Sequence, residues 1–132
     1  MIYEFCAENV TLLEKAMQAG ARRIELCDNL AVGGTTPSYG VTKAAVELAA
    51  NYDTTIMTMI RPRGGDFVYT DLEIAIMLED IRLTTQAGSQ GVVFGALTAD
   101  KKLDKPNLEK LIAASKGMEI VFHMAFDELS DE

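Results

Sequence analysis

The sequence has no tryptophan, a single histidine, two cysteines and three prolines among its 132 residues. Two cysteines are too few for the disulfide framework that stabilises small secreted domains. No apolar run approaches the roughly 18 to 20 residues that cross a bilayer. The first residues, 1–6, carry no basic segment followed by an apolar stretch, so we expect no secretory signal. These absences favour a cytoplasmic globular protein without membrane contacts.

Positive charge is also scarce. Twelve Lys and Arg residues stand against 20 Asp and Glu, which gives a net charge of −8 at pH 7. Binding to nucleic acid requires a basic face, so we expect no nucleic-acid partner. Hydrophobic residues make up 48% of the chain, enough to form one buried core. We therefore expect a single domain over residues 1–132.

Short β-type runs alternate with longer runs of helical spacing. The pattern predicts five strands, at residues 2–6, 23–27, 55–61, 91–95 and 118–123, and four helices between them, at 9–19, 41–50, 71–86 and 106–115. This alternation is typical of βα units and a parallel sheet, an α/β fold. In the third helix, the apolar set predicted to face the core is Leu72, Ala75, Ile76, Leu78 and Leu83.

Strand alternation predicts which polar residues share a face, because side chains two apart point the same way. With the apolar residues packed under the helices, the residues predicted on the inner face of a curved sheet are Glu4, Cys6, Glu25, Cys27, Arg61 and His123. Several of them lie at carboxyl ends of predicted strands. Barrels and open α/β sheets place their sites at these ends.

Cys6 and Cys27 end two consecutive predicted strands, so their sulfurs could approach each other. Thiolates with thioether neighbours suit Cu(I), and Met57 and Met59 follow on the next strand. The alternative is that both cysteines are buried as small hydrophobic residues and both methionines fill gaps in the core.

The inner-face charges allow two interpretations. Glu4, Glu25, Arg61 and His123 could form a general acid/base set with an anion-binding arginine, or a structural polar network inside a barrel. His123 could equally be a hydrogen-bonded structural residue, although Asp127 could orient its ring. Both interpretations remain open from the sequence.

The segment 61–67, Arg-Pro-Arg-Gly-Gly-Asp-Phe, is the most distinctive loop. Arg61 and Arg63, with exposed backbone N–H groups at the two glycines, could hold a phosphate or carboxylate. Alternatively, the loop is a surface turn with a solvated Arg63. In the loop 33–38, Thr36 is expected to cap the helix that begins at Pro37.

These residues together resemble the CutC copper-homeostasis family. The matching segments are Glu4-Phe5-Cys6, residues 23–27, Gly33-Gly34-Thr35-Thr36-Pro37-Ser38, residues 59–67, residues 93–98 and Phe122-His123 with Ala125-Phe126-Asp127. The resemblance implies a TIM barrel, a cytoplasmic location and a role in copper handling. The cysteines proposed as Cu(I) ligands in the family match Cys6 and Cys27. Met124 stands where members usually carry Arg, which puts an anion-binding role at that position in doubt.

A closed (β/α)₈ barrel typically needs about 250 residues. Five strands and four helices make about five eighths of one, so we expect an incomplete TIM-barrel-type domain from a truncated member or a fragment. Its open edges and interior would favour association into a homo-oligomer. The leading prediction is a Cu(I)-binding homeostasis protein, and the alternative is a TIM-barrel enzyme that acts on a small anionic substrate through the Glu, Arg and His set. Whether the protein is an enzyme stays open.

Overall fold

The computed structural model describes residues 4–8, 10 and 12–122, and the side chains of Glu4 and Phe5 lie outside the description. Strands and helices alternate along this part of the chain. The strands are β1 (Glu4–Glu8), β2 (Arg23–Cys27), β3 (Thr55–Met59), β4 (Gly91–Phe94) and β5 (Glu119–Phe122); the helices are α1 (Leu13–Gln18), α2 (Tyr39–Ala49), α3 (Asp71–Ala87) and α4 (Lys105–Ala114), with a short 3₁₀ turn at Leu30–Val32. No helix in these ranges is long and apolar enough to span a membrane.

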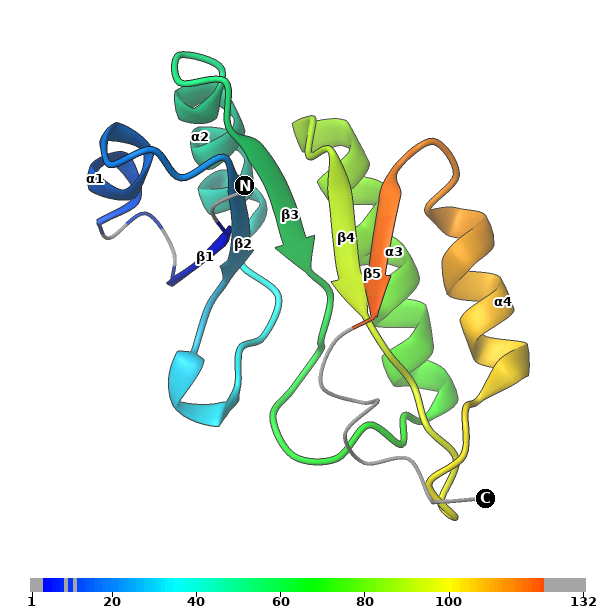
Figure 1. Cartoon of the computed structure of the whole chain (residues 1–132). Coiled ribbons are helices and arrows are strands. Elements are labelled where there is room, and N and C mark those ends of the chain that lie inside the picture. The colour runs from blue at the N-terminus through cyan, green and yellow to red at the C-terminus, as the bar shows by residue number, and fades with distance from the viewer. Residues whose placement is uncertain (1–3, 9, 11, 123–132) are drawn as a thin grey trace.

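The strands form one parallel sheet in the order β1-β2-β3-β4-β5, with the helices on one side of it (Figure 1). Each strand therefore pairs with its neighbour in sequence, as in the successive βα units of a barrel. The predicted α/β fold of five parallel strands and four helices, arranged as part of a TIM-barrel-like fold, is confirmed.

The core lies between the sheet and the helices. Residues of the strands on this side, with Ile60 directly after β3, are fully buried: Ile24, Leu26, Ile56, Ile60, Val92 and Phe94. They pack in two clusters, one with α1 and α2 and the other with α3 and α4. Because neighbours in register share a face, the row from Cys6 through Glu25 and Met57 to Gly91 lies on the opposite, inner face. The predicted alternation of faces is thus confirmed for β2 and β3.

The predicted apolar face of α3 is wrong for Leu72, Ala75 and Ile76, which are exposed, whereas Leu78 packs against the core as predicted. Leu72 is 72% exposed and Ile76 is 43% exposed. The residues that α3 buries are instead Ile74, Met77, Ile81, Thr84 and Ala87. This stripe has the three- and four-residue spacing of one helix face, and it includes a threonine that an apolar pattern overlooks. A capping box between Thr70 and Glu73 fixes where the helix begins.

Candidate functional site

Two loops meet at the carboxyl ends of β2 and β3. The backbone N–H of Thr36 donates to the carbonyl of Arg61 at 3.0 Å, and the N–H of Arg61 donates to Thr36 Oγ1 at 2.8 Å. Thr36 is therefore not the cap of α2, contrary to the prediction. Ser38 is the cap, and its Oγ accepts the Val41 N–H at 3.1 Å. The Thr36 hydroxyl is taken by the backbone of the neighbouring loop, and this tie brings the two loops together.

A thiol and a thioether lie side by side beneath the first loop. Cys27 ends β2 and Met59 ends β3, each one residue beyond the last register pair, Leu26 and Thr58. Gly34 covers both, since a methyl group there would lie 2.8 Å from Met59 Sδ and 3.3 Å from Cys27 Sγ. With a φ of +95°, Gly34 adopts a backbone conformation that other residues rarely take. A glycine thus lets the loop approach the two sulfur atoms closely.

Cys6 lies on the same inner face but not directly opposite Cys27. In the register of β1 and β2, Cys6 faces Glu25 and Cys27 faces Glu8. The predicted end of the first strand at Cys6 is wrong, because β1 continues to Glu8 and places Cys6 in its middle. Cys6 is exposed, Cys27 is buried, and no disulfide joins these two described residues. The thiols are diagonal neighbours across two strands.

The Cys27 thiol is protonated at neutral pH. Burial raises its pKa to about 11, and electrostatic interactions with Cys6 and with the carboxylates of Glu8, Asp28 and Glu25 act in the same direction. The Cys27 thiol also donates a hydrogen bond to the carbonyl of Ala7 at 3.6 Å. A cation that binds to this sulfur must therefore displace a proton.

Met57, the other candidate thioether, lies deeper in the sheet. It pairs in register with Glu25 on one side and with Gly91 on the other. It is fully buried, and a methyl group at Gly91 would lie 2.5 Å from its Sδ. Met57 therefore fills the space left by Gly91, whereas Met59 adjoins Cys27.

Arg61 is a buried arginine, 3% exposed, that ties the two loops together through its side chain. Its Nη1 donates to the carbonyls of Val32 at 2.6 Å and Gly34 at 3.0 Å, and its Nη2 donates to the carbonyl of Gly65 at 2.8 Å. Its guanidinium lies 4.9 Å from the ring centre of Phe67. No carboxylate among the described residues forms an ion pair with Arg61. Its guanidinium is stabilised by hydrogen bonds to uncharged backbone carbonyls instead.

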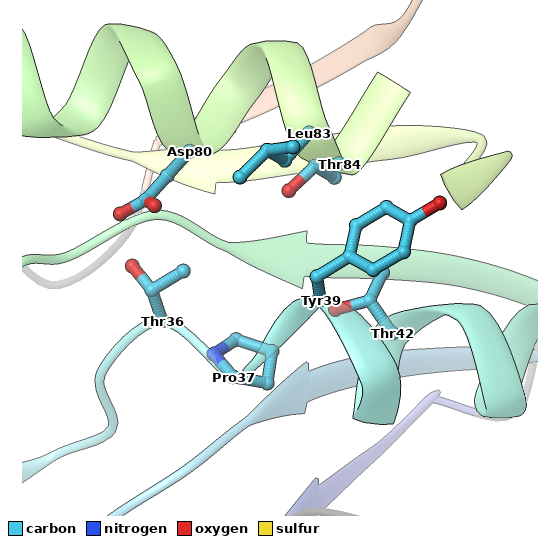
Figure 2. Close-up of a pocket in the computed structure, with 7 residues that line it drawn as sticks. All are labelled: Thr36, Pro37, Tyr39, Thr42, Asp80, Leu83 and Thr84. Atoms are coloured by element: carbon cyan, nitrogen blue, oxygen red, sulfur yellow. The ribbon is translucent and has the colours of Figure 1, made fainter. Parts of the chain in front are cut away.

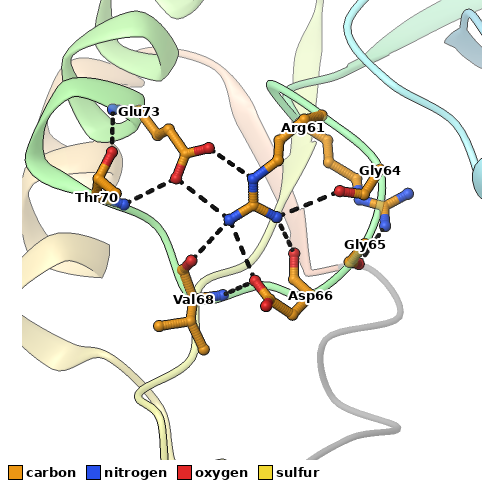
Figure 3. Close-up of polar contacts among 8 residues, drawn as sticks. Arg61, Gly64, Gly65, Asp66, Val68, Thr70 and Glu73 are labelled. Carbon is orange, nitrogen blue, oxygen red and sulfur yellow. Dashed lines mark hydrogen bonds and ion pairs between the residues drawn. The ribbon is translucent and has the colours of Figure 1, made fainter.

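Arg63, two residues later, has charged partners instead (Figure 3). It pairs with Glu73 through Nε at 2.6 Å and with Asp66 through Nη2 at 3.1 Å. It also donates to the carbonyls of Gly64, Asp66 and Val68. The Glu73 contact raises the pKa of Arg63, and the Arg63 contact lowers that of Glu73. Every nitrogen of Arg63 thus already donates within its own loop and to α3.

The remaining predicted site residues are only partly described. Glu25 is half-buried on the inner face, between Cys6 and Met57 in register. The side chain of Glu4 and all of His123, Met124 and Asp127 lie outside the described residues. The acid/base set therefore stays a prediction, and with it the enzyme alternative.

Sequence reasoning missed two residues at this end of the sheet. Glu8 Oε2 accepts the N–H of Leu30 at 2.9 Å and so fixes the start of the loop above Cys27. Tyr69 is buried, and its ring lies 5.2 Å from the Arg63 guanidinium. The distinctive Arg-Pro-Arg-Gly-Gly-Asp-Phe segment covers residues 61–67, and Tyr69 lies two residues beyond its end.

A small cavity lies outside the sheet, between α2 and α3 (Figure 2). Its volume is about 20 Å³, enough for one or two water molecules. The residues that line it are Thr36, Pro37, Tyr39, Thr42, Asp80, Leu83 and Thr84. Burial, with a smaller effect of Glu79, raises the pKa of Asp80. The cavity is too small for an organic substrate.

The described residues contain no group of three or more His, Cys, Asp and Glu side chains that could hold a metal ion. The sulfur atoms at Cys27 and Met59, with Cys6 diagonal to them, are a different donor set. Soft sulfur ligands select Cu(I), whereas Mg²⁺ and Ca²⁺ require oxygen ligands. The site therefore fits a soft ion held by few ligands.

Comparison with known proteins gives a consistent result. A model of the CutC family matches residues 1–132. A CutC family protein from Streptococcus pyogenes serotype M6 is 55% identical over 129 residues, covering 98% of this chain and 62% of its own length. One from Enterococcus faecalis is 53% identical over 132 residues, covering 100% and 63%. The chain thus spans less than two thirds of these relatives.

Solved structures agree on the fold. The crystal structure of the putative copper homeostasis protein CutC from Streptococcus agalactiae superposes with a TM-score of 0.94 at 49% identity, over 98% of this chain and 62% of that one. PhdJ bound to a substrate intermediate superposes with a TM-score of 0.60 at 9% identity, over 92% of this chain. At that identity the second likeness concerns the fold alone.

Proposed function

Because the chain belongs to the CutC family, we propose that it takes part in copper homeostasis and binds Cu(I) through Cys6 and Cys27. The S. agalactiae relative is described as a putative copper homeostasis protein. The observation that carries the proposal is the pair of sulfur atoms, Cys27 Sγ and Met59 Sδ, packed around Gly34 at the carboxyl ends of β2 and β3.

Three sulfur ligands define the proposed site. Cys27 provides a buried thiol, Cys6 an exposed thiol on the same face, and Met59 a thioether. In this proposal the ion enters at Cys6, because Cys6 is exposed and lies diagonally across β1 and β2 from the buried Cys27. Met57, beside Gly91, is outside this set.

Proton release accompanies binding. Since the pKa of Cys27 is about 11, the thiol must lose its proton when Cu(I) binds. The affinity for Cu(I) therefore rises with pH through the neutral range. The positive charge of Cu(I) also offsets the negative charges of Glu8, Asp28 and Glu25 around the sulfur.

The test is an anaerobic titration with Cu(I) against a competing chelator. Cys27→Ser and Cys6→Ser should each weaken binding by about 100-fold or more, the loss expected when one of few soft ligands is replaced by a hard one. Met59→Leu should weaken it by about tenfold, and Met57→Leu is the matched control that should leave it unchanged. If both serine variants bind Cu(I) as tightly as the parent, the proposal is wrong.

A further inference from the structure

Two buried polar atoms near the carboxyl end of β3 have no hydrogen-bond partner among the described residues. They are Nε of Arg61 and the hydroxyl oxygen of Tyr69. Both side chains are more than nine-tenths buried, with exposed fractions of 3% and 7%. Buried donors without a partner are rare in folded proteins because each costs about 1–3 kcal/mol. Two in one loop call for a common explanation.

The two groups belong to one neighbourhood. The segment 61–69 folds so that arginines and aromatic rings interleave, with Arg61 against Phe67 at 4.9 Å and Arg63 against Tyr69 at 5.2 Å. Burial raises the pKa of Tyr69 to about 12, while the nearby positive charges of Arg61 and Arg63 act in the opposite direction. The Tyr69 hydroxyl therefore lies close to the Arg61 guanidinium.

The charge balance at Arg61 points to a negative ligand. Its other two guanidinium nitrogens donate to uncharged carbonyls of Val32, Gly34 and Gly65. A buried cation normally has a counter-ion, since removing it from water is costly. Arg63 has two such carboxylates, Asp66 and Glu73. Among the described residues, Arg61 therefore has no carboxylate partner, and its Nε–H donates to no acceptor.

We propose that Arg61 and Tyr69 form a binding site for a small oxyanion, a phosphate or carboxylate group, whose oxygen accepts hydrogen bonds from Arg61 Nε–H and from the Tyr69 hydroxyl. Such charge-assisted bonds are the stronger class of hydrogen bond. The site lies at the carboxyl end of β3, where barrels bind their ligands. It is independent of the sulfur atoms and does not depend on the proposed copper function.

The test uses the copper-free 132-residue chain and measures thermal unfolding with inorganic phosphate, acetate or chloride at matched ionic strength. Phosphate or acetate, and not chloride, should raise the melting temperature of the parent. Comparison of these two ions identifies the preferred oxyanion. Tyr69→Phe should make this rise clearly smaller, and Tyr39→Phe, which removes the hydroxyl of an exposed tyrosine, should retain it in full. Without added anion, Tyr69→Phe should be as stable as the parent or more so, because it removes an unpartnered buried hydroxyl.

A second measurement follows the Arg61 Nε–H signal directly by ¹⁵N NMR during the titration. It should shift with phosphate or acetate in the parent, and the apparent dissociation constant should rise about tenfold in Tyr69→Phe, as expected for loss of one hydrogen bond. An unchanged melting temperature and an unmoved signal in the parent would overturn the proposal. An equal response to the anions in Tyr69→Phe and the parent would overturn it as well.

Discussion

The two ends of the sheet each carry an arginine on or near the inner face, and the two arginines have different kinds of partner. At the amino end, Arg23 of β2 donates to Glu119 of β5 at 2.9 Å, an ion pair that crosses the concave side of the sheet. At the carboxyl end, Arg61 is buried and is held by carbonyls of two loops. Arg23 has a carboxylate partner, whereas no carboxylate of the described part of the chain pairs with Arg61.

This difference in partners suits an amino end that stabilises the fold and a carboxyl end that binds a ligand. In barrel folds, the carboxyl ends of the strands carry the site and the amino ends serve stability. Here the carboxyl end also collects Cys27, Met59 and the glycine that lets a loop approach them. The unpartnered polar atoms of Arg61 and Tyr69 and the buried thiol of Cys27 therefore lie near the same end of the sheet, the carboxyl end.

The largest effect on stability should come from Arg61. Arg61→Met removes the donor to the carbonyls of Val32, Gly34 and Gly65 and should lower the free energy of unfolding by about 2–4 kcal/mol. Urea unfolding measures the change. Arg82→Met is the control, because Arg82 is an exposed arginine paired with Glu79, and its loss should cost less than about 0.5 kcal/mol. Equal losses in the two variants would contradict the role of Arg61 as the tie between loops.

Gly34→Ala should affect both stability and copper. The added methyl would meet Met59 Sδ at 2.8 Å in a left-handed backbone conformation, so we expect a loss of about 1–2 kcal/mol and at least about tenfold weaker Cu(I) binding. Gly20→Ala is the matched control, because Gly20 has a φ of +101° with nothing within 4 Å of the added methyl. It should cost similar stability and leave Cu(I) binding intact. Identical Cu(I) affinities in the two variants would argue against a site beneath Gly34.

Alkaline pH should destabilise the carboxyl end. The pKa of Cys27 is raised from 9.0 to about 11 and that of Tyr69 from 10.0 to about 12, both mainly by burial. The folded state therefore keeps protons that the unfolded chain loses, and stability present below pH 9 falls as the pH rises through these values. The melting temperature should drop by a few degrees between about pH 8 and pH 11. In Tyr69→Phe the drop should be smaller, and an equal drop would show that Tyr69 contributes nothing to it.

The smallest effect should come from the amino end. Arg23→Gln and Glu119→Gln should each change the free energy of unfolding by less than about 1 kcal/mol, because the Glu119 side chain is 52% exposed and water screens the pair. A double-mutant cycle with both substitutions isolates the coupling, which should weaken at high salt. A coupling above about 2 kcal/mol would show that the two ends of the sheet do not differ as described.

The fold could be predicted from the sequence because it depends on periodic patterns. Alternation along β2 predicts Glu25 and Cys27 on one face, and the register with β1 agrees for both. Arg61 lies beyond the end of β3, so the sheet register does not test its predicted face. Element boundaries were less predictable. The residues that extend β1 to Glu8 carry no β-branched signal, and their strand state comes from pairing with β2.

The site was less predictable than the fold, because its partners come from distant backbone. Nothing in the sequence around Arg61 indicates that carbonyls of the loop near Gly34 would hold it. Likewise, Thr36 has the sequence signature of a helix cap, but tertiary contact with the Arg61 backbone takes its hydroxyl. The sequence also does not distinguish Met59 from Met57 as a candidate thioether ligand. The strand register and the position of Gly34 make this distinction.

The most direct test of the copper site is X-ray absorption spectroscopy at the copper edge of the Cu(I)-loaded chain. We predict a first coordination shell of sulfur alone in the parent, and a lower sulfur count in both Cys27→Ser and Met59→Leu. Met57→Leu should give the spectrum of the parent. A first shell dominated by nitrogen or oxygen in the parent would contradict a sulfur site at the carboxyl ends of β2 and β3.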